Sequence, residues 1–462
     1  MDTFQLEQLQ QDLSGRIIWP GDELYQQASH TFLHKGDPAL VVRPTTNADV
    51  AAAIRYARDN SLTLSVRSGG HSFAGFGTNS GGLVIDLSLM KDVQVIDPAE
   101  HIVRIQAGAT WGEAAEVLRE HHLAISSGDT RSVGVGGLTL GGGIGWMARK
   151  HGLAIDSLLS AQIVTASGEV LRASAIQNPD LFWALRGGGG NFGVVTGFEF
   201  VAQPISKVFA GSLVYGSEDL AGIIRGWRDV MRSAAEELTT SLVSMPPFAG
   251  NPAAVVILCC YAGTGPAAVQ AVAPLLELGM LLQEDLQEKD YADVLEEAQQ
   301  LPDFLRIIGK NVFVDSLSDE LIQDLGAVCG REGSPVVSLR SLGGALGRVA
   351  PEATAYAYRQ SEALVTGGIF VPANATESEV SQALKPWEAI AAYGSGVYGN
   401  FQGTASAADV AAIYPPETYA RLAAIKARYD PHNLFNQNHN IRPDLAGIGN
   451  TAGPDGHEQA YP

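Results

Sequence analysis

Three glycine-rich stretches are the residues of this chain best suited to holding a cofactor. They run over residues 68–77, 134–145 and 187–193. Glycine allows positive φ angles and lets backbone amides approach a ligand without interference from a Cβ atom, as cradling a diphosphate requires. One such loop is most simply a tight turn. Three of them in one α/β region favour a nucleotide cofactor.

The surroundings of the third stretch argue against a nicotinamide site. Gly188, Gly190 and Gly193 match the dinucleotide pattern G-x-G-x-x-G, which binds a pyrophosphate when it follows a strand and opens a helix. Here the predicted order is reversed, with a helix before the glycines and a strand after them. The sequence also has no glycine run that ends in Gly-Lys-Ser/Thr, so it contains no P-loop.

The elements that position these loops follow from the hydrophobic pattern. A strand at 40–43, a helix at 46–60 and a strand at 63–66 are predicted to deliver the chain to residues 67–71. Further strands are predicted at 83–86, 93–97, 102–106, 162–164, 170–172 and 194–201, and helices at 110–121 and 178–186. This alternation is typical of an α/β or α+β domain.

The pattern changes after Pro204, where glycine runs become fewer. Strands are predicted at 255–261, 336–339 and 364–371, with a helix at 265–278. These elements indicate a second layer, in which helices back one sheet. The tail after Pro443 is polar and rich in glycine, which is typical of a mobile segment.

Composition limits the partners and the compartment. The chain has 30 basic and 50 acidic residues, a net charge of -20, so its surface should repel nucleic acid and anionic lipid. The N-terminus lacks the basic start and apolar core of a signal peptide, and no stretch approaches a membrane span, which predicts a cytoplasmic protein. Cys259, Cys260 and Cys329 are predicted to be buried small hydrophobes. The pair His121-His122 is predicted to lie at the surface, and no metal site is expected.

Three strings of residues carry a family resemblance. They are RSGGHSFAGFGTNSGGLVIDLSLM at 67–90, SVGVGGLTLGGGIGWMARKHGL at 132–153 and YDPHNLFNQNHNIRP at 429–443. Together they resemble the berberine bridge enzyme-like FAD-linked oxidases of the vanillyl-alcohol oxidase and p-cresol methylhydroxylase (VAO/PCMH) superfamily. The chain as a whole looks similar to the bacterial hydroxynicotine oxidase type.

The resemblance implies an FAD bonded covalently to His71 through its 8α-methyl carbon. A neutral imidazole is nucleophilic, and the flavin methyl group can tautomerise to an electrophile. The alternative for His71 is a loop histidine that caps a turn. The resemblance also implies cofactor contacts from four segments, namely Arg67, Ser68, Gly69, Gly70 and Ser72 at the pyrophosphate, Val133, Gly134, Gly137, Gly142, Gly143 and Gly145 at the flavin and diphosphate, Gly193 and Val195 near the adenine, and Asn438 and Asn440 at the flavin ring.

Two further positions distinguish this chain within the resemblance. Many members of the branch tether the flavin a second time through a cysteine, but this chain has Thr130 at that place. We therefore predict a single tether, which favours a smaller substrate. Val133 stands where the family has its oxygen-access position, and a small β-branched residue there favours reaction with O2 over dehydrogenase activity. Valine at this position is equally a common core residue.

The usual catalytic base is missing. In many relatives it is the tyrosine that ends a Tyr-x-Asn-Tyr sequence, whereas this chain has Phe401 at that position, after Tyr398, Gly399 and Asn400. Three explanations stay open: Tyr398 does the work, another residue such as Tyr356 or Tyr358 does, or the substrate needs no base. The last suits amines, whose neutral form can give up hydride directly.

These observations predict an α+β, two-domain FAD-binding fold of the PCMH/VAO type. Residues 1–205 are expected to bind FAD and 206–404 to form an inserted substrate domain, an antiparallel sheet backed by helices. Residues 405–446 should return to the FAD domain, and 447–462 should form a flexible tail. The expected function is two-electron oxidation of a small alcohol, amine or ring carbon, with O2 reduced to H2O2. The alternatives are a flavin dehydrogenase with another acceptor and a non-catalytic protein that binds a flavin or metabolite.

Overall fold

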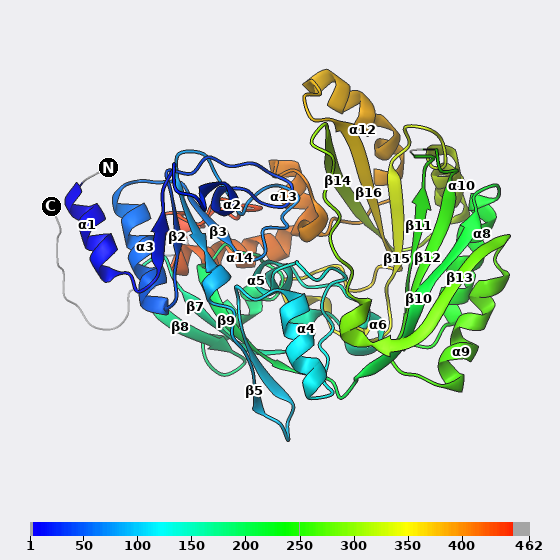
Figure 1. The fold of residues 1–462 in the computed structure, drawn as a ribbon, viewed down its shortest axis with the longest axis horizontal. Helices are drawn as coiled ribbons and strands as arrows, with labels where there is room; N and C mark the ends of the chain where they lie inside the picture. The colour runs from blue at the N-terminus through cyan, green and yellow to red at the C-terminus, as the bar shows by residue number, and fades with distance from the viewer. Residues whose placement is uncertain (1–2, 249, 447–462) are drawn as a thin grey trace.

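The computed structural model describes residues 3–248 and 250–446, which form two halves side by side (Figure 1). The half that contains the N-terminal residues holds a four-stranded and a five-stranded sheet, and the other half holds a seven-stranded sheet. No helix within the described residues is long and apolar enough to span a membrane.

The four-stranded sheet leads the chain to residues 68–82, which carry His71 and which we call the His71 loop. In spatial order its strands are β1 (Arg16–Ile18), β2 (Leu40–Arg43), β4 (Leu83–Asp86) and β3 (Leu64–Arg67). The crossover from β2 to β3 is helix α3 (Asn47–Asp59), which begins at a capping box formed by Thr46 and Asp49. Both β2 and β3 run parallel to β4, and their aliphatic side chains are largely buried. The sheet therefore fixes the position at which the loop starts.

The five-stranded sheet is antiparallel and packs into the same core. Its strands are, in order, β5 (Val93–Asp97), β6 (Ile102–Gln106), β9 (Val194–Val201), β7 (Leu158–Val164) and β8 (Val170–Ser174). The longer helices of this part are α4 (Trp111–Glu120) and α7 (Pro179–Leu185). Two short helices, α5 (Val135–Leu140) and α6 (Ala148–His151), carry the second glycine stretch and the turn that follows it. Side chains from both sheets form one continuous hydrophobic cluster.

The seven-stranded sheet makes up the other half and is antiparallel throughout. Its order is β13 (Leu281–Asp290), β10 (Lys207–Gly216), β12 (Ala254–Tyr261), β11 (Leu238–Met245), β15 (Val336–Ser341), β16 (Ala363–Pro372) and β14 (Leu305–Val314). Helices α8 (Leu220–Ser233), α10 (Asp319–Val328) and α12 (Glu377–Ala391) pack on one face through a second hydrophobic cluster. Because side chains alternate along each strand, the opposite face of this sheet stays free of these helices.

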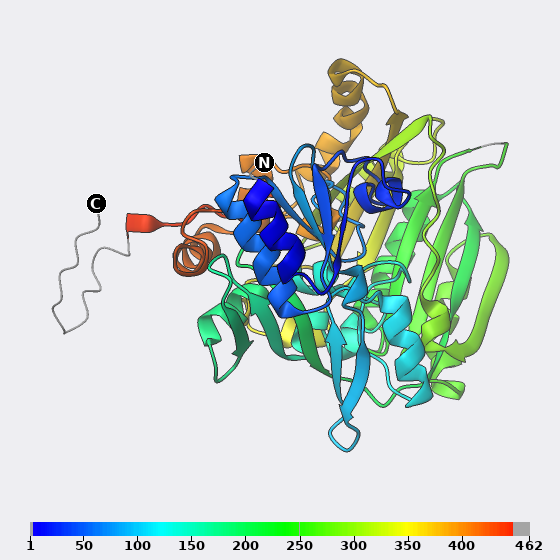
Figure 2. The same cartoon turned by 60° about the vertical axis from the view of Figure 1, so that its left-hand side comes forward.

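The chain returns to the first half at its end. Helices α13 (Ala407–Ile413) and α14 (Pro416–Tyr429) follow the seven-stranded sheet, and Leu422 and Ile425 of α14 belong to the cluster of the first two sheets. Figure 2 shows the same arrangement after a turn of 60° about the vertical axis, with the N-terminal helix α1 (Thr3–Asp12) and helix α3 brought forward. The remaining short elements are α2 (Tyr25–Ser29), α9 (Pro266–Val272), α11 (Ala345–Arg348) and the 3-10 turns η1 (Leu87–Leu89), η2 (Ala154–Asp156), η3 (Ala273–Glu277), η4 (Tyr291–Val294), η5 (Pro351–Ala353) and η6 (Gly399–Phe401).

The structure confirms the strands and helices predicted between residues 40 and 201, with end shifts of a residue or two at most of them. The helix predicted at 265–278 is present, but it changes type along its length, from the α-helix α9 to the 3-10 turn η3. Pro274, at the start of η3, lacks an N–H group and its ring disfavours the preceding α-helical turn, which is consistent with the change of helix type there. The predicted domain boundaries at 205 and 404 fall in connecting segments. The predicted tail, 447–462, lies outside the described residues.

The predictions for the cysteines and for the histidine pair are confirmed. The three cysteines are buried and unpaired, as predicted, and His121 and His122 are both exposed, as predicted. Within the described residues, no group of three or more His, Cys, Asp or Glu side chains is placed to hold a metal ion.

Candidate functional site

The first two glycine stretches meet backbone to backbone. A Cβ atom on Gly69 would lie 2.2 Å from the Gly134 nitrogen, and one on Gly134 would lie 2.0 Å from Ser68 Oγ. Only glycine permits this approach. The hydroxyl of Ser68 ties the loops together, since it donates to the Ala107 carbonyl at 2.6 Å and accepts from the Gly136 amide at 3.3 Å. The predicted cofactor segments 67–72 and 133–137 therefore form one surface.

His71 lies on this surface, four residues beyond the end of β3. Its ring stacks on that of Phe32, with centroids 4.7 Å apart and planes at 18°. The side chain is partly exposed, and burial lowers the pKa of His71 from its ordinary value. The imidazole is therefore in its neutral, nucleophilic form around neutral pH.

The side chain of Arg67 is buried and bound to groups of the protein. Its guanidinium donates to Asp86 at 2.7 Å and to the His30 carbonyl at 2.9 Å, and its side chain is 7% exposed. Asp86 also accepts from Arg43 at 2.7 Å. Burial alone would raise the pKa of Asp86, but the two guanidinium groups outweigh it and hold that pKa below its ordinary value. The Arg67 guanidinium is thus bound within the protein, and a contact of Arg67 with the pyrophosphate remains a prediction.

The second glycine stretch continues into a turn that contacts the seven-stranded sheet. Gly142 and Gly143 have φ of 125° and 81°, which favours glycine at both. A Cβ on Gly142 would lie 2.8 Å from the ring of Tyr356, and one on Gly145 would lie 1.7 Å from the Ser127 carbonyl oxygen. This turn therefore brings the predicted flavin-binding glycines against the predicted catalytic tyrosines.

Tyr398 is held at this turn by a network of hydrogen bonds. Its phenolic oxygen accepts from the Gly143 amide at 3.1 Å and from Asn400 Nδ2 at 2.8 Å. Its backbone is fixed by Asn311 of β14, which accepts from the Tyr398 amide and donates to the Tyr398 carbonyl. Burial raises the pKa of Tyr398, although the two bonds to its oxygen oppose that effect. The hydroxyl is therefore protonated at neutral pH.

The two other predicted tyrosines differ sharply from each other. Tyr358 donates its hydroxyl to the Ala412 carbonyl at 2.6 Å, and burial raises the pKa of Tyr358 to about 12. Tyr356 is buried, and its hydroxyl has no hydrogen-bond partner among the described residues. Burial raises the pKa of Tyr356 well above its ordinary value. Of these two, only Tyr356 has a hydroxyl free to bind another molecule.

Tyr356 is held in place by a buried ion pair that joins the two halves. Arg359 is fully buried and donates to both carboxylate oxygens of Asp156, at 2.7 and 2.9 Å. Its guanidinium lies 5.1 Å from the centre of the Tyr356 ring. The backbone amide of Tyr356 donates to the Arg186 carbonyl at 3.2 Å.

Aromatic rings surround Tyr398. Phe401, which replaces the usual tyrosine, lies edge-on to Tyr398 at 5.2 Å and to Phe73 at 6.1 Å. Tyr356 lies edge-on to Tyr398 at 6.2 Å. We call Phe73, Tyr356, Tyr398 and Phe401 the aromatic wall. It joins the His71 loop to the predicted catalytic tyrosines.

The C-terminal segment is anchored by a second buried ion pair. Lys426 and Asp430 of the α14 end are both 0% exposed and 2.9 Å apart. Lys426 also donates to the carbonyls of Asn191 and Phe435, at 2.8 and 2.7 Å. Asn438 in turn donates to the carbonyls of Gly190 and Phe435. The third glycine stretch and residues 435–441 are therefore joined, as the return of the chain requires.

The end of the third stretch packs closely against strand β7. Gly193 has a φ of 153°, and its Cβ would lie 2.5 Å from the Val164 carbonyl oxygen. Val195 is a buried residue of β9 that pairs with Ile163 of β7. Contacts of Gly193 and Val195 with an adenine remain a prediction.

Unpaired buried polar atoms test whether these residues fit a cofactor. Within the described part of the chain, several side-chain oxygens near the predicted site have no hydrogen-bond partner in the protein, namely those of Ser132, Thr139, Tyr356, Asn438 and Asn440. An unsatisfied buried polar group costs about 1–3 kcal/mol, so native proteins leave few of them. Gly137 has no heavy atom within 4 Å of where its Cβ would lie. A ligand rich in donors and acceptors, such as FAD, fits this set.

Thr130 stands where many relatives have the second flavin-linking cysteine, and its backbone forms a bridge to another segment. Thr130 pairs with Glu296 in an isolated parallel bridge, and its hydroxyl donates to Asp129 at 3.0 Å. Asp129 binds Arg340 of β15 in an ion pair. Val133 is partly buried, and its carbonyl accepts from the Trp111 amide at 2.9 Å. Access of O2 beside Val133 remains a prediction.

The helix-free face of the seven-stranded sheet supplies residues that the sequence analysis missed. The register places Asn311 opposite Thr366, and Ser338 beside both Thr366 and Val243. Arg340 lies on the same face, between Ser241 and Leu364, and donates to the Ile144 carbonyl at 3.3 Å. The alternation of polar residues in 336–341 was a signal for a face of this kind, but only the strand register assigns it.

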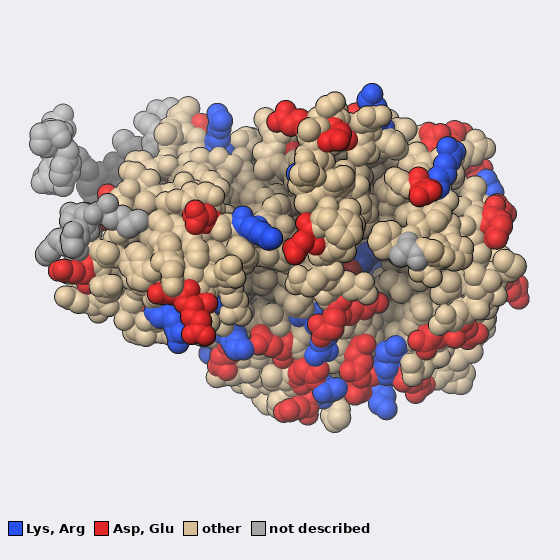
Figure 3. All heavy atoms as spheres, turned by 45° about the horizontal axis from the view of Figure 1, so that its top comes forward, with Lys and Arg blue, Asp and Glu red and all other residues tan. Residues whose placement is uncertain are grey.

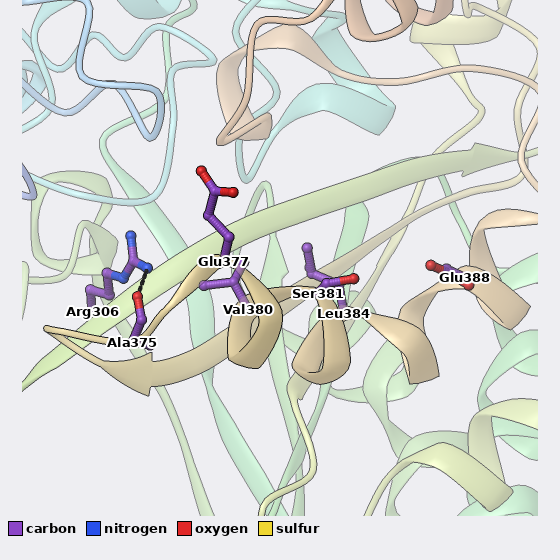
Figure 4. A pocket seen from close by; sticks show the side chains of 7 residues that line it. All are labelled: Arg306, Ala375, Glu377, Val380, Ser381, Leu384 and Glu388. Atoms are coloured by element: carbon purple, nitrogen blue, oxygen red, sulfur yellow. Dashed lines mark hydrogen bonds between the residues drawn. The ribbon is translucent and has the colours of Figure 1, made fainter.

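Two hollows lie elsewhere on the surface. One of about 370 Å³ is lined by Arg306 of β14 and by one face of α12 (Figure 4). The other, also about 370 Å³, lies between Arg149 and the end of α8. Neither is lined by a residue predicted to bind FAD. Figure 3 shows acidic and basic side chains interspersed on one face, which is hollowed near its middle.

Two family models match the regions of the chain that form the candidate site. A family model described as "FAD binding domain" matches residues 38–174, and one described as "Berberine and berberine like" matches residues 398–442. These ranges include the first two glycine stretches and the Tyr398 to Asn440 region.

Individual relatives cover nearly the whole chain. (R)-6-hydroxynicotine oxidase of Paenarthrobacter nicotinovorans is 32% identical over 455 residues, which cover 94% of this chain and 97% of that protein. The crystal structure of 6-hydroxy-D-nicotine oxidase from Arthrobacter nicotinovorans has a TM-score of 0.84 and 29% identity, and covers 94% of this chain and 98% of that one. Xylooligosaccharide oxidase from Myceliophthora thermophila C1 has a TM-score of 0.83 and 26% identity, and covers 95% of this chain and 99% of that one.

Proposed function

Because this chain belongs to the berberine bridge enzyme-like FAD-linked oxidases of the VAO/PCMH superfamily, we propose that it oxidises a small amine and carries its FAD covalently on His71. The chain is an FAD-linked oxidoreductase of the α+β fold that this superfamily shares. The finer assignments of substrate, tether and individual residues rest on the geometry of the site.

FAD, when bound, accepts two electrons as hydride from a substrate C–H bond and passes them to O2. We assign its binding to the surface where residues 68–72 meet 133–137, to the turn at 142–145, and to the C-terminal segment with Asn438 and Asn440. The unpaired oxygens of Ser132, Thr139 and Asn440 support this assignment, because each needs a polar partner. The neutral ring of His71 supports its role as the point of attachment. Thr130 in place of a cysteine supports a single tether.

The protonated state of the tyrosines is the observation that favours an amine as the substrate. An alcohol needs a base to accept its O–H proton, but burial raises the pKa of Tyr356, Tyr358 and Tyr398 alike. A phenol that is already protonated cannot accept that proton at neutral pH. The hydroxyl of Tyr358 is in addition bonded to a carbonyl. A neutral amine gives up hydride without such a base, and the amine substrate in the name of (R)-6-hydroxynicotine oxidase supports the same choice.

The remaining roles follow from what each side chain can do. Tyr398 and Tyr356 donate hydrogen bonds to the substrate, while Gly143 and Asn400 hold the Tyr398 oxygen in place. The rings of Phe401 and Phe73 exclude water from the reacting carbon, which keeps the amine in its neutral form. Val133 supports O2 as the electron acceptor.

A peroxide assay across a substrate panel tests the proposal. The panel contains secondary and tertiary cyclic amines, including (R)-6-hydroxynicotine, together with benzylic alcohols and oligosaccharides. We expect peroxide with amines, and kcat/KM should rise with pH through the pKa of each amine because the free base reacts. Oxidation of alcohols with a pH profile set by one enzyme group would contradict the base-free reaction. Substrate reduction of the flavin without reoxidation by O2 would indicate a dehydrogenase instead.

A further inference from the structure

A segment before the matched FAD-binding domain runs along the whole His71 loop. We call residues 29–37 the strap; the family model begins after it, at residue 38. At one end, the Ser29 carbonyl accepts from the hydroxyl of Thr78 at 2.6 Å. At the other end, the Asp37 amide donates to the Asn79 carbonyl at 3.0 Å, and the Asp37 carbonyl accepts from the Gly81 amide at 2.8 Å.

The middle of the strap holds the residues on both sides of His71. The amide of Phe32 donates to the Gly70 carbonyl at 3.0 Å. His34 bonds through Nε2 to the Phe73 carbonyl at 2.8 Å. The Arg67 side chain reaches the His30 carbonyl at 2.9 Å. The backbone of the loop is thus held at Gly70, directly before His71, and at Phe73, two residues after it.

Glycines on the loop make this close approach possible. Gly75 has a φ of 79°, and a Cβ on it would lie 2.9 Å from the His34 ring. A Cβ on Gly36 of the strap would lie 1.9 Å from the Thr78 hydroxyl oxygen. The strap and the His71 loop therefore pack closely against each other along their length.

Phe32 is the strap residue that touches His71 itself. Its ring covers one face of the imidazole at a centroid distance of 4.7 Å and an angle of 18°. Stacking on one face restricts rotation of the imidazole but leaves the ring edge, where both nitrogens lie, uncovered. An imidazole free to rotate would present its nitrogen in the right direction for only part of the time.

We propose that the strap positions His71 for covalent attachment of the flavin, and that Phe32 is the positioning residue. This inference rests on the proposed attachment to His71. In the attachment, a bond forms between an imidazole nitrogen and the 8α carbon, which loses one hydrogen as a proton, while the imidazole N–H proton is released. The two electrons left on the flavin pass to O2, giving H2O2. Proximity and orientation govern the rate of such a step, and a misplacement of about 1 Å can slow it about 100-fold.

Four full-length proteins test this inference: wild type, Phe32→Ala, Phe32→Tyr and His34→Ala. Each is purified after expression with limited riboflavin and incubated with excess FAD in air, and the covalent flavin is measured against time by fluorescence in denaturing gels. The FAD dissociation constant is measured in parallel by fluorescence quenching at times before attachment. His34→Ala is the matched control, because it removes a strap contact but leaves the ring on His71.

We expect Phe32→Ala to slow covalent incorporation about tenfold or more while its FAD dissociation constant stays within about threefold of wild type. Phe32→Tyr, which keeps the stacked ring, should restore the wild-type rate, and His34→Ala should have the smaller effect. Incorporation by Phe32→Ala at the wild-type rate would overturn the inference. Loss of FAD binding in parallel with the rate, or no rescue by Phe32→Tyr, would also overturn it, since the role would then be structural. Absence of covalent flavin in wild type would instead refute the attachment to His71.

Discussion

Replacement of Lys426 by methionine should destabilise the protein more than any surface change on the same helix. Its ammonium group is fully buried, lies 2.9 Å from Asp430 and donates to the carbonyls of Asn191 and Phe435. Burial lowers the pKa of Lys426, while Asp430 opposes that effect. Lys426→Met would leave a buried carboxylate without its counter-charge. It would also remove a donor from the carbonyls of Asn191 and Phe435, although the Phe435 carbonyl still accepts from Asn438.

The size of the effect follows from these contacts. Removing one partner of a buried ion pair costs about 3–5 kcal/mol, because the other charge stays buried. The carboxylate of Asp430 keeps the amides of Leu434 and Phe435, at 2.8 and 2.9 Å, which limits the loss to that range. Lys426→Met/Asp430→Asn removes the stranded charge and should recover part of the free energy of unfolding.

Urea unfolding followed by tryptophan fluorescence gives the free energies for these variants. Arg421→Met is the control on α14, since Arg421 is 46% exposed and its nearest carboxylate oxygen, on Asp180, is 3.7 Å away. It should change the free energy of unfolding by about 1 kcal/mol or less. A Lys426→Met value as small as that of Arg421→Met would refute the reasoning, as would a double variant less stable than Lys426→Met.

Three other changes have expected outcomes. The folded-state pKa of Asp86 is held below its ordinary value, so the stability that Asp86 contributes is present above its unfolded pKa of about 3.9 and is lost as pH falls through the folded pKa. Asp86→Asn should therefore make the free energy of unfolding depend less steeply on pH in acid. An unchanged pH dependence would contradict this. Gly137→Ala should leave the apoprotein at least as stable as wild type, because no heavy atom lies within 4 Å of the new Cβ. It should nevertheless weaken FAD binding, measured by fluorescence titration. Unaltered affinity would count against Gly137 as a cofactor contact. Tyr398→Phe should lower kcat/KM for the best amine about tenfold, which corresponds to about 1.4 kcal/mol. Tyr358→Phe should lower it less than about threefold, because the Tyr358 hydroxyl is bonded to the Ala412 carbonyl. Equal losses in peroxide assays would reject the assignment.

Local chemistry made the glycine loops and the helix starts predictable. Thr46 with Asp49 and Thr110 with Glu113 form capping boxes at the predicted helix starts. Such signals involve residues three apart, so a sequence shows them directly. The change of helix type within 265–278 was equally local, and Pro274 was the signal that the prediction did not use.

Contacts between distant segments could not be predicted in the same way. Arg67 and Asp86 are direct neighbours because β3 and β4 pair in parallel, and only that register shows that the guanidinium is already bound. Phe32 lies 39 positions before His71, and no periodic pattern connects the two. Asn311 bonds to the Tyr398 carbonyl across 87 residues of sequence, and no local pattern connects these two residues either. The sequence thus predicted glycine loops that the structure brings together, but not which side chains hold them.

Acid precipitation of the purified protein, followed by mass spectrometry of the flavin-bearing peptide, tests the central claim most directly. Covalent FAD requires a nucleophile at the flavin edge, and the account assigns this role to His71 alone. We expect yellow colour in the pellet, one modified peptide that contains His71, and no acid-stable flavin on His71→Ala, which should still fold. Flavin released into the supernatant by wild type, or acid-stable flavin retained by His71→Ala, would contradict the account.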